Sequence, residues 1–182
     1  VNGGLAVQES IKDKFIPCGL ELGGKDPAYV RSDADAKDAD QNLVDGSFFN
    51  SGQSCCGSER SYVHEDVYDE FVEKFVEVTK TYKLGNPFDK DTNLGPMVKT
   101  SASDYVRNQI KEAVNKGAKS LVDESLFPQS QEGTPYLSPH VLVDVDHSMA
   151  VMKDESFGPV VGIMKVSNDE EAIKLMNDSE YG

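Results

Sequence analysis

Two adjacent cysteines, Cys55 and Cys56, follow a run of small polar residues in the stretch FFNSGQSCCGSER, residues 48–60. Small residues let the backbone turn tightly, so that the thiol of Cys55 can face a cavity. Backbone N–H groups beside a thiol lower its pKa from a reference of ~8.5 and can later bind an oxyanion. The pattern therefore suits a nucleophile, although spacing alone leaves a plain buried cysteine as the commoner alternative.

Two carboxylates stand in comparable contexts. Glu21 lies between two leucines in LELGGKDP, residues 20–27, and a carboxylate among apolar residues suits a general base. Glu155 precedes Phe157 by two residues in DESFGPVVG, residues 154–162. A carboxylate can accept hydrogen bonds from sugar hydroxyls, and a ring can lie against a flat heterocycle. The structural alternatives are a solvent-facing strand end for Glu21 and capping of a strand entry for Glu155.

The elements that must position these residues alternate between helices and strands. Apolar periodicity and capping residues predict helices, and short apolar or alternating runs predict strands. Helices are expected over 5–15, 35–49, 66–82, 101–116 (closed by Gly117) and after Ser167 or Asn168; strands are expected over 15–22, 60–65, 119–124, 136–145 and 158–166. This alternation predicts an α/β fold with a largely parallel sheet flanked by helices.

Composition excludes several classes of function. The 182 residues carry 18 basic and 32 acidic side chains, a formal charge of −14 that disfavours nucleic acid and anionic membrane. We see no apolar run of the ~20 residues that span a bilayer and no signal peptide. Three cysteines and three scattered histidines predict neither a disulfide framework nor a metal site. We therefore expect a cytoplasmic, reduced protein, with Cys18 in the core.

Five motifs together resemble one family. LELGGKDP, FFNSGQSCCGSER, LGNPFD, LGPMV and DESFGPVVG occur in this order, with 34 residues from Glu21 to Cys55 (55 − 21 = 34). In order and separation they are similar to the NAD(P)-dependent aldehyde dehydrogenases, and the resemblance runs over nearly the entire chain. It implies an enzyme that acts on a small-molecule aldehyde with NAD or NADP as cofactor.

The resemblance also implies catalytic roles. Cys55 matches the family's catalytic thiol, which forms a thiohemiacetal with the aldehyde and then a thioester. Glu21 matches the glutamate that activates water to hydrolyse this thioester to a carboxylic acid. Cys56 falls on a neighbouring position that is not the nucleophile.

Four further residues match the family's cofactor site. Glu155 matches the residue that binds the nicotinamide ribose, and Phe157 matches an aromatic residue beside it. Leu22 and Gly23 correspond to backbone near the nicotinamide ring.

The resemblance implies a divided organisation as well. Residues 1–20 match the tail end of a truncated cofactor-binding domain, and residues 21–182 match a catalytic domain without its C-terminal segment. No glycine-rich phosphate-binding turn is present in the sequence. We therefore expect a portion of a longer, homo-oligomeric enzyme that is inactive by itself.

Three alternative functions remain. A related enzyme could pass the thioester to coenzyme A, but the presence of Glu21 disfavours this. A non-catalytic, structural or binding member of the family is disfavoured because Cys55 and Glu21 are both present. A cysteine hydrolase is disfavoured because His64, the nearest histidine in sequence, lies on a predicted strand that leads away from Cys55.

Overall fold

A mostly parallel sheet organises the chain. The computed structural model describes residues 2–181, with side chains for all of these except residues 2, 36–38 and 40. Within this range the sheet has five strands in the order β1-β2-β5-β4-β3. The parallel strands are β1 (Asp26–Val30), β2 (Ser58–His64), β5 (Val160–Val166) and β4 (His140–Val143), and β3 (Lys119–Ser120) pairs antiparallel with β4. The predicted α/β class with a largely parallel sheet is confirmed.

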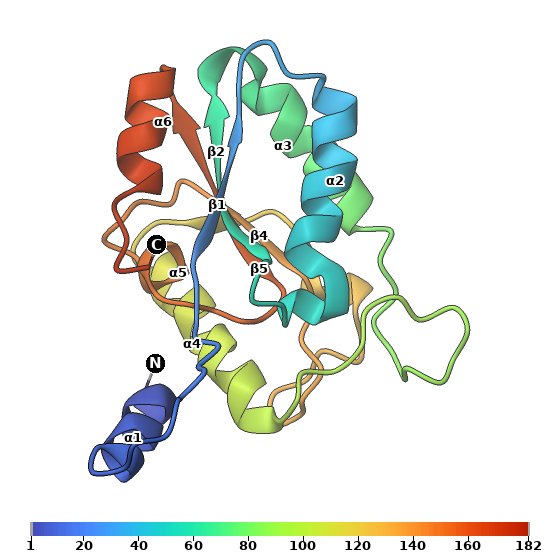
Figure 1. The fold of residues 1–182 in the computed structure, drawn as a ribbon. Helices are drawn as coiled ribbons and strands as arrows, with labels where there is room; N and C mark the ends of the chain where they lie inside the picture. The colour runs from blue at the N-terminus through green and yellow to red at the C-terminus, as the bar shows by residue number, and fades with distance from the viewer. Residues whose placement is uncertain (1, 182) are drawn as a thin grey trace.

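Helices cover both faces of this sheet (Figure 1). On one face lie α2 (Ala36–Phe48) and α3 (Glu65–Thr79). On the other lie α4 (Thr100–Asn115), α5 (Ala150–Lys153) and α6 (Asp169–Met176). Single 3-10 turns follow at η1 (Phe49–Gly52) and η2 (Glu124–Leu126). The three longest of these helices lie within two or three residues of the predicted bounds, while α5 was not predicted.

Local chemistry explains where the helices begin and end. Asn168 caps α6 by accepting a hydrogen bond from the backbone of Glu171 at 2.9 Å. Two acidic residues, Glu65 and Asp66, occupy the first turn of α3, where they suit the helix dipole. Gly117, with φ +112°, follows α4 in a conformation that stops a helix. Capping signals in the sequence thus set these boundaries.

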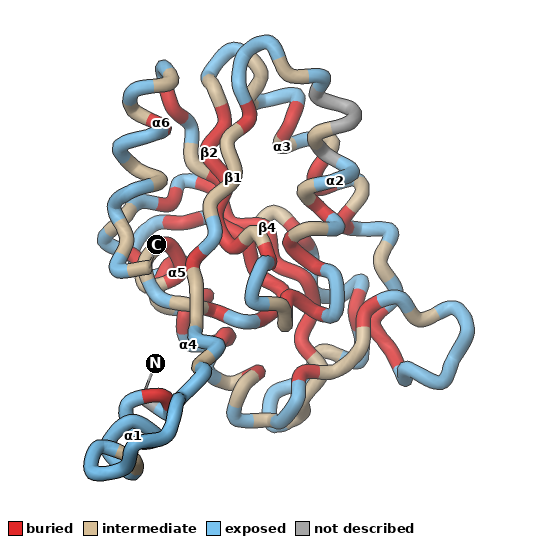
Figure 2. The backbone as a smooth tube through the Cα atoms, viewed as in Figure 1, coloured by how far each residue is buried: buried red, intermediate tan, exposed pale blue. Residues whose placement is uncertain are grey.

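The core consists of two apolar clusters, one on each face of the sheet. The first includes Phe48, whose ring packs edge-on against Phe75 at 6.1 Å and Tyr82 at 5.9 Å between ring centres. The second gathers side chains of α4, α5 and α6 around Leu142 and Met152. Figure 2 shows the central strands as the most buried part of the molecule. Both faces of the sheet are therefore closed to water, which suits parallel strands.

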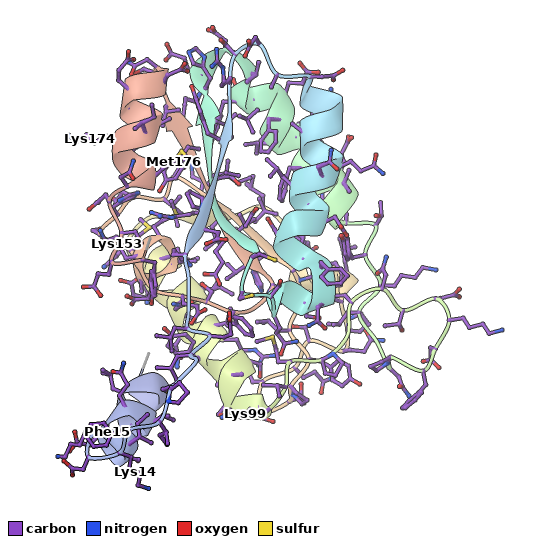
Figure 3. All side chains as sticks on the ribbon, in the orientation of Figure 1. Lys14, Phe15, Lys99, Lys153, Lys174 and Met176 are labelled. Atoms are coloured by element: carbon purple, nitrogen blue, oxygen red, sulfur yellow. The ribbon has the colours of Figure 1, made fainter. Side chains whose placement is uncertain are left out.

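The N-terminal residues form a separate, exposed lobe. Helix α1 (Asn2–Ile11) and residues 12–22 extend away from the sheet (Figure 1), and nearly all of this lobe is exposed (Figure 2). The chain turns back so that the leucine at position 22 lies against Gly4 of α1. Phe15, which is labelled on this lobe in Figure 3, is fully exposed.

Two predictions for this region are wrong. Residues 15–22 form no strand, and the first strand is β1, which begins after the glycine pair. Pro17 and Gly19 disfavour a strand, whereas β1 is an edge strand that accommodates Pro27 through a shift in register. Cys18, expected in the core, is exposed because it belongs to the lobe.

Candidate active site

Three chain segments that carry predicted site residues meet at one edge of the sheet. Residues 23–25 precede β1, residues 54–57 precede β2, and residues 154–159 precede β5. These strands are neighbours and run parallel, so their amino ends lie at the same edge. The fold therefore brings together three motifs that are far apart in sequence.

A tight turn presents the two cysteines. The backbone N–H of Gly57 donates to the carbonyl of Ser54 at 3.1 Å, so Cys55 and Cys56 occupy the centre of the turn. Both are exposed free cysteines. The sulfur of Cys56 lies 3.3 Å from the Ser54 hydroxyl. A plain buried cysteine, the alternative considered for Cys55, is therefore not what the fold contains.

An unusual backbone leads into this turn. Asn50, Ser51 and Gly52 have φ values of 51°, 58° and 68°, in the left-handed region that favours glycine. A Cβ atom on Gly52 would lie 2.2 Å from the carbonyl oxygen of Gly158, so only glycine fits there. The hydroxyl of Ser51 donates to the carbonyl of Gly95 at 2.7 Å. The cysteine turn is thus wedged between two other segments of the chain.

Gln53 fastens the same turn with its side-chain amide. Its oxygen accepts the backbone N–H of Val98 at 2.7 Å. Its nitrogen donates to the carbonyls of Asn50 at 3.1 Å and Pro96 at 3.3 Å. An amide can donate and accept at once, so one side chain links the cysteine stretch to the LGPMV stretch.

Two adjoining cavities surround these segments. The smaller, of about 390 Å³, is lined by Cys55 and Gly23, and the larger, of about 680 Å³, is lined by Glu155 and Phe157. Tyr181 lines both cavities, which are therefore adjacent. Four of the six predicted site residues thus lie around these two cavities.

Glu155 packs closely on the glycine pair. Its Oε1 accepts the backbone N–H of Gly24 at 3.1 Å. A Cβ atom on Gly23 would lie 2.4 Å from Oε2 of the same carboxylate. The glycine pair therefore lets a carboxylate approach the backbone, and this contact joins the walls of the two cavities.

Glu21 and Leu22 do not join this group. Both are exposed, and neither lines the two cavities. The apolar surroundings expected for Glu21 are absent because residues 15–22 form no strand. Glu21 faces solvent instead, which was the structural alternative for this residue.

Sequence reasoning missed a set of buried charged residues, two of which, Lys25 and Arg60, line the smaller cavity. Lys25 donates to Glu59 Oε2 at 2.6 Å, and Arg60 Nε donates to the carbonyl of Lys25 at 2.8 Å. Arg60 also donates to the carbonyl of Met176 at 2.9 Å, at the end of α6. Burial lowers the pKa of Lys25 below its ordinary value, and the Glu59 carboxylate opposes this shift. Two successive charged residues at the start of a buried strand, Glu59 and Arg60, were the available signal.

The histidines have structural partners away from Cys55. His64 lies at the far end of β2, where Nδ1 accepts the backbone N–H of Asp66 at 3.2 Å and caps α3. His147 Nε2 lies 2.8 Å from the hydroxyl of Tyr62. His140 is buried, and burial, followed by the charge of Arg107, lowers its pKa to about 4.

Two kinds of feature are absent from the part of the chain that the structure describes. The described side chains include no cluster of three or more histidine, cysteine, aspartate or glutamate residues arranged to hold a metal ion. Across the same residues, the helices are too short or too polar to cross a membrane.

Comparisons with known proteins find relatives of this chain. The family model described as "Aldehyde dehydrogenase family" matches residues 2–182. The chain is 38% identical to 3,6-anhydro-alpha-L-galactose dehydrogenase of Vibrio sp. (strain EJY3) over 90% of this chain and 34% of that protein. It is 39% identical to D-glyceraldehyde dehydrogenase (NADP(+)) of Thermoplasma acidophilum over 90% of this chain and 33% of that protein.

A solved structure has the same fold. The crystal structure of lactaldehyde dehydrogenase from Escherichia coli superposes with a TM-score of 0.91 and 36% sequence identity. The match covers 100% of this chain and 38% of that one. The chain thus spans about a third of the length of the curated relatives it matches.

Proposed function

The chain belongs to the aldehyde dehydrogenase family, and from this premise we propose that it forms the catalytic part of an enzyme that oxidises an aldehyde to a carboxylic acid with NAD or NADP. The observation that carries the proposal is the meeting of three motifs at the amino ends of β1, β2 and β5. There Cys55 lines one cavity, and Glu155 and Phe157 line the adjoining one.

Cys55 is the proposed nucleophile. Its thiol is exposed at the smaller cavity and held in a turn that the rest of the chain fixes from two sides. As a thiolate it adds to the aldehyde carbon and forms a thiohemiacetal, whose oxyanion the backbone N–H of Cys55 can stabilise. Covalent attachment divides one difficult oxidation into two easier steps.

The larger cavity is the proposed place for the nicotinamide end of the cofactor. Three carboxylates line it, those of Asp154, Glu155 and Glu180, and they suit both ribose hydroxyls and a positively charged ring. Phe157, which is 40% exposed, offers an aromatic face there. Gly23 has no side chain, and a Cβ atom there would collide with Glu155. The bare backbone at this position suits close contact with the nicotinamide ring. When bound, NAD or NADP supplies the acceptor for the hydride that leaves the thiohemiacetal carbon.

Glu21 is the proposed base for the second half of the reaction. It takes a proton from water, which then attacks the thioester on Cys55 and releases the carboxylic acid. Glu21 stands two residues before Gly23, which lines the cavity of Cys55.

A pair of cysteine variants tests the nucleophile in the full-length enzyme. Cys55→Ala removes the proposed nucleophile and should abolish aldehyde oxidation while NAD or NADP still binds. Cys56→Ala is the matched control, because Cys56 shares the turn but lines neither cavity, and it should retain activity. Oxidation rates and cofactor titrations report the two properties. Continued turnover by Cys55→Ala would rule out the assignment.

We also propose that residues 1–20 are the end of a cofactor-binding domain and residues 21–182 a catalytic domain within a longer homo-oligomer. The separate, exposed lobe of α1 and residues 12–22 supports a boundary near this point. Its three free cysteines suit a reducing, cytoplasmic setting. The purified 182-residue chain should therefore fail to oxidise a short aldehyde with NAD, and robust turnover would contradict the division.

A further inference from the structure

A buried ion pair that the proposed mechanism does not use joins Lys25, which lines the cavity of Cys55, to Glu59. The side chains of Lys25 and Glu59 are 0% and 6% exposed, with Nζ and Oε2 2.6 Å apart. Two charges leave water at a cost that only good geometry and further hydrogen bonds offset. The pair therefore needs an explanation beyond its own attraction.

The Glu59 carboxylate also accepts hydrogen bonds from two successive backbone amides. Oε2 accepts the N–H of Ser156 at 2.8 Å, and Oε1 accepts the N–H of Phe157 at 2.8 Å. Lys25 completes the arrangement by donating to the hydroxyl of Ser156 at 2.9 Å. A carboxylate with one oxygen on each of two neighbouring amides fixes the orientation of the peptide between them.

That peptide is held in an unfavourable conformation. Phe157 has φ +48°, a left-handed value that is uncommon for a residue with a side chain. Such a conformation persists only where the surroundings determine it, and such sites cluster where a protein binds or reacts. The Glu59 carboxylate supplies the determining contacts.

The residues of this stretch line the proposed cofactor cavity. Glu155, Ser156 and Phe157 all line it, and the Ser156 hydroxyl also accepts a hydrogen bond from Lys25 of the ion pair. We propose that Glu59, paired with Lys25, is a positioning residue that sets the backbone at Ser156 and Phe157 and thereby aims Glu155 and Phe157 at the nicotinamide end of NAD or NADP. This inference rests on the proposed function.

Glu59→Gln in the full-length enzyme is the first test. Glutamine keeps the size of the side chain, but its NH₂ group cannot accept an N–H, so one of the two amides loses its acceptor. The KM for the cofactor should rise about 10-fold, the effect of losing one good hydrogen bond. The KM for the aldehyde and the alkylation rate of Cys55 should change less than the cofactor KM, because Glu59 lines neither cavity and because Ser51 and Gln53 fasten the cysteine turn.

Two further variants separate positioning from stability. Phe71→Leu makes a cavity in the apolar cluster beneath α3, away from residues 155–157, so it should lower stability and leave the cofactor KM unchanged. Lys25→Met with Glu59→Gln removes both charges, which restores much of the stability lost by breaking a buried pair. The double variant should still show the raised cofactor KM, because the amides still lack their carboxylate. If Glu59→Gln alone fails to fold, the double variant still allows the cofactor KM to be measured.

Hydrogen exchange provides a readout that does not depend on activity. The amides of Ser156 and Phe157 should exchange about 10-fold faster in the double variant than in the wild type, because each ten-fold corresponds to the loss of one such bond. An unchanged cofactor KM in both Glu59 variants, or an equal rise in Phe71→Leu, would overturn the proposal. A wild-type enzyme that oxidises no aldehyde would instead overturn the proposed function, and with it the cofactor role of Glu59, while the exchange result would still report the backbone contact.

Discussion

The proposed nucleophile and the proposed base lie in regions of opposite character. Cys55 follows a backbone that Gly52, Ser51 and Gln53 fasten to neighbouring segments, at the amino end of a central strand. Glu21 belongs to residues 12–22, which have no helix or strand beyond the end of α1 and lie exposed beside it. One group is fixed by the chain's own contacts, whereas the other is not.

This difference separates two requirements of the proposed reaction. Attack on a carbonyl demands a nucleophile placed within a fraction of an ångström, and rigid elements supply such placement. A base that acts in a later step needs only to lie within hydrogen-bond reach of the attacking water in that step. We infer that the sheet edge sets the geometry of the first step, while the lobe governs only the second.

We expect the largest difference between the core and the lobe in stability, when one phenylalanine of each region is replaced. Phe48→Ala should lower the free energy of unfolding by about 3–5 kcal/mol, because the ring is completely buried against Phe75 and Tyr82. Phe15→Ala in the lobe should change it by less than about 0.5 kcal/mol, because the ring touches little but water. Denaturant unfolding of the 182-residue chain measures both. Similar losses from the two substitutions would mean that the lobe is packed after all.

A rate measurement tests whether the exposed carboxylate acts at all. In the full-length enzyme, Glu21→Gln should slow thioester hydrolysis by about 10²–10⁴-fold, the usual contribution of a general base, and slow hydride transfer less. Rapid-mixing kinetics would show a burst of reduced cofactor followed by slow turnover. Glu9→Gln, which changes another exposed carboxylate of the lobe, is the control and should behave as the wild type. An unchanged hydrolysis rate would assign the base to another residue.

The sequence predicted the fold class and most elements because their signals are local. The helix over 66–82 repeats apolar residues at helical spacing, and the structure has α3 at Glu65–Thr79. The strand expected over 158–166 is β5, which begins at Val160. In contrast, β1 has only five residues and begins with Asp26 and Pro27, which are typical of turns. Its pairing with β2, not its own pattern, makes it a strand.

The site was predictable in part for the same reason. Motifs predicted Cys55, Gly23, Glu155 and Phe157 as site residues, and the fold gathers these four around two adjacent cavities. The burial expected for Glu21 depended on a strand that does not form. Bonds that join residues 97 or 131 positions apart, such as those of Glu59 to Ser156 and of Lys25 to Ser156, have no local signature. Partners of that kind appear only once the strand order is known.

Two glycine substitutions compare the backbone of the cysteine turn with the backbone of the lobe. Gly52→Ala should destabilise the chain by about 2–4 kcal/mol, because a left-handed backbone and a Cβ atom 2.2 Å from the Gly158 carbonyl act together. Gly19→Ala in the lobe should cost less than about 0.5 kcal/mol, because no atom lies within 4 Å of its Cβ position. Unfolding curves give the energies, and alkylation of Cys55 reports the turn. If Gly52→Ala left the free energy of unfolding unchanged, the close approach of Gly52 to Gly158 would not be needed to hold the turn.

Mild acid should act on the sheet and spare the lobe. His140 in β4 is buried, and its hydroxyl neighbours Ser120 and Ser138 lie 3.3 and 3.2 Å from its ring nitrogens. Burial lowers its pKa to about 4 from an ordinary value of 6.5, so between these values the unfolded chain binds a proton that the folded chain does not. Stability is therefore fully present above pH 6.5 and falls as the pH is lowered towards 4, by about 2 kcal/mol between pH 7 and pH 5.

His140→Gln isolates this effect, because glutamine keeps hydrogen-bonding groups but does not titrate. The wild type and the variant should differ in the slope of unfolding free energy against pH, the variant being flatter by about one proton between pH 4 and 6.5. Hydrogen exchange at pH 5 should then rise in β4 and β5 of the wild type, with no matching change in α1, which has no such buried group. Equal slopes for the two proteins would place the acid sensitivity elsewhere, and the contrast between sheet and lobe would then rest on packing alone.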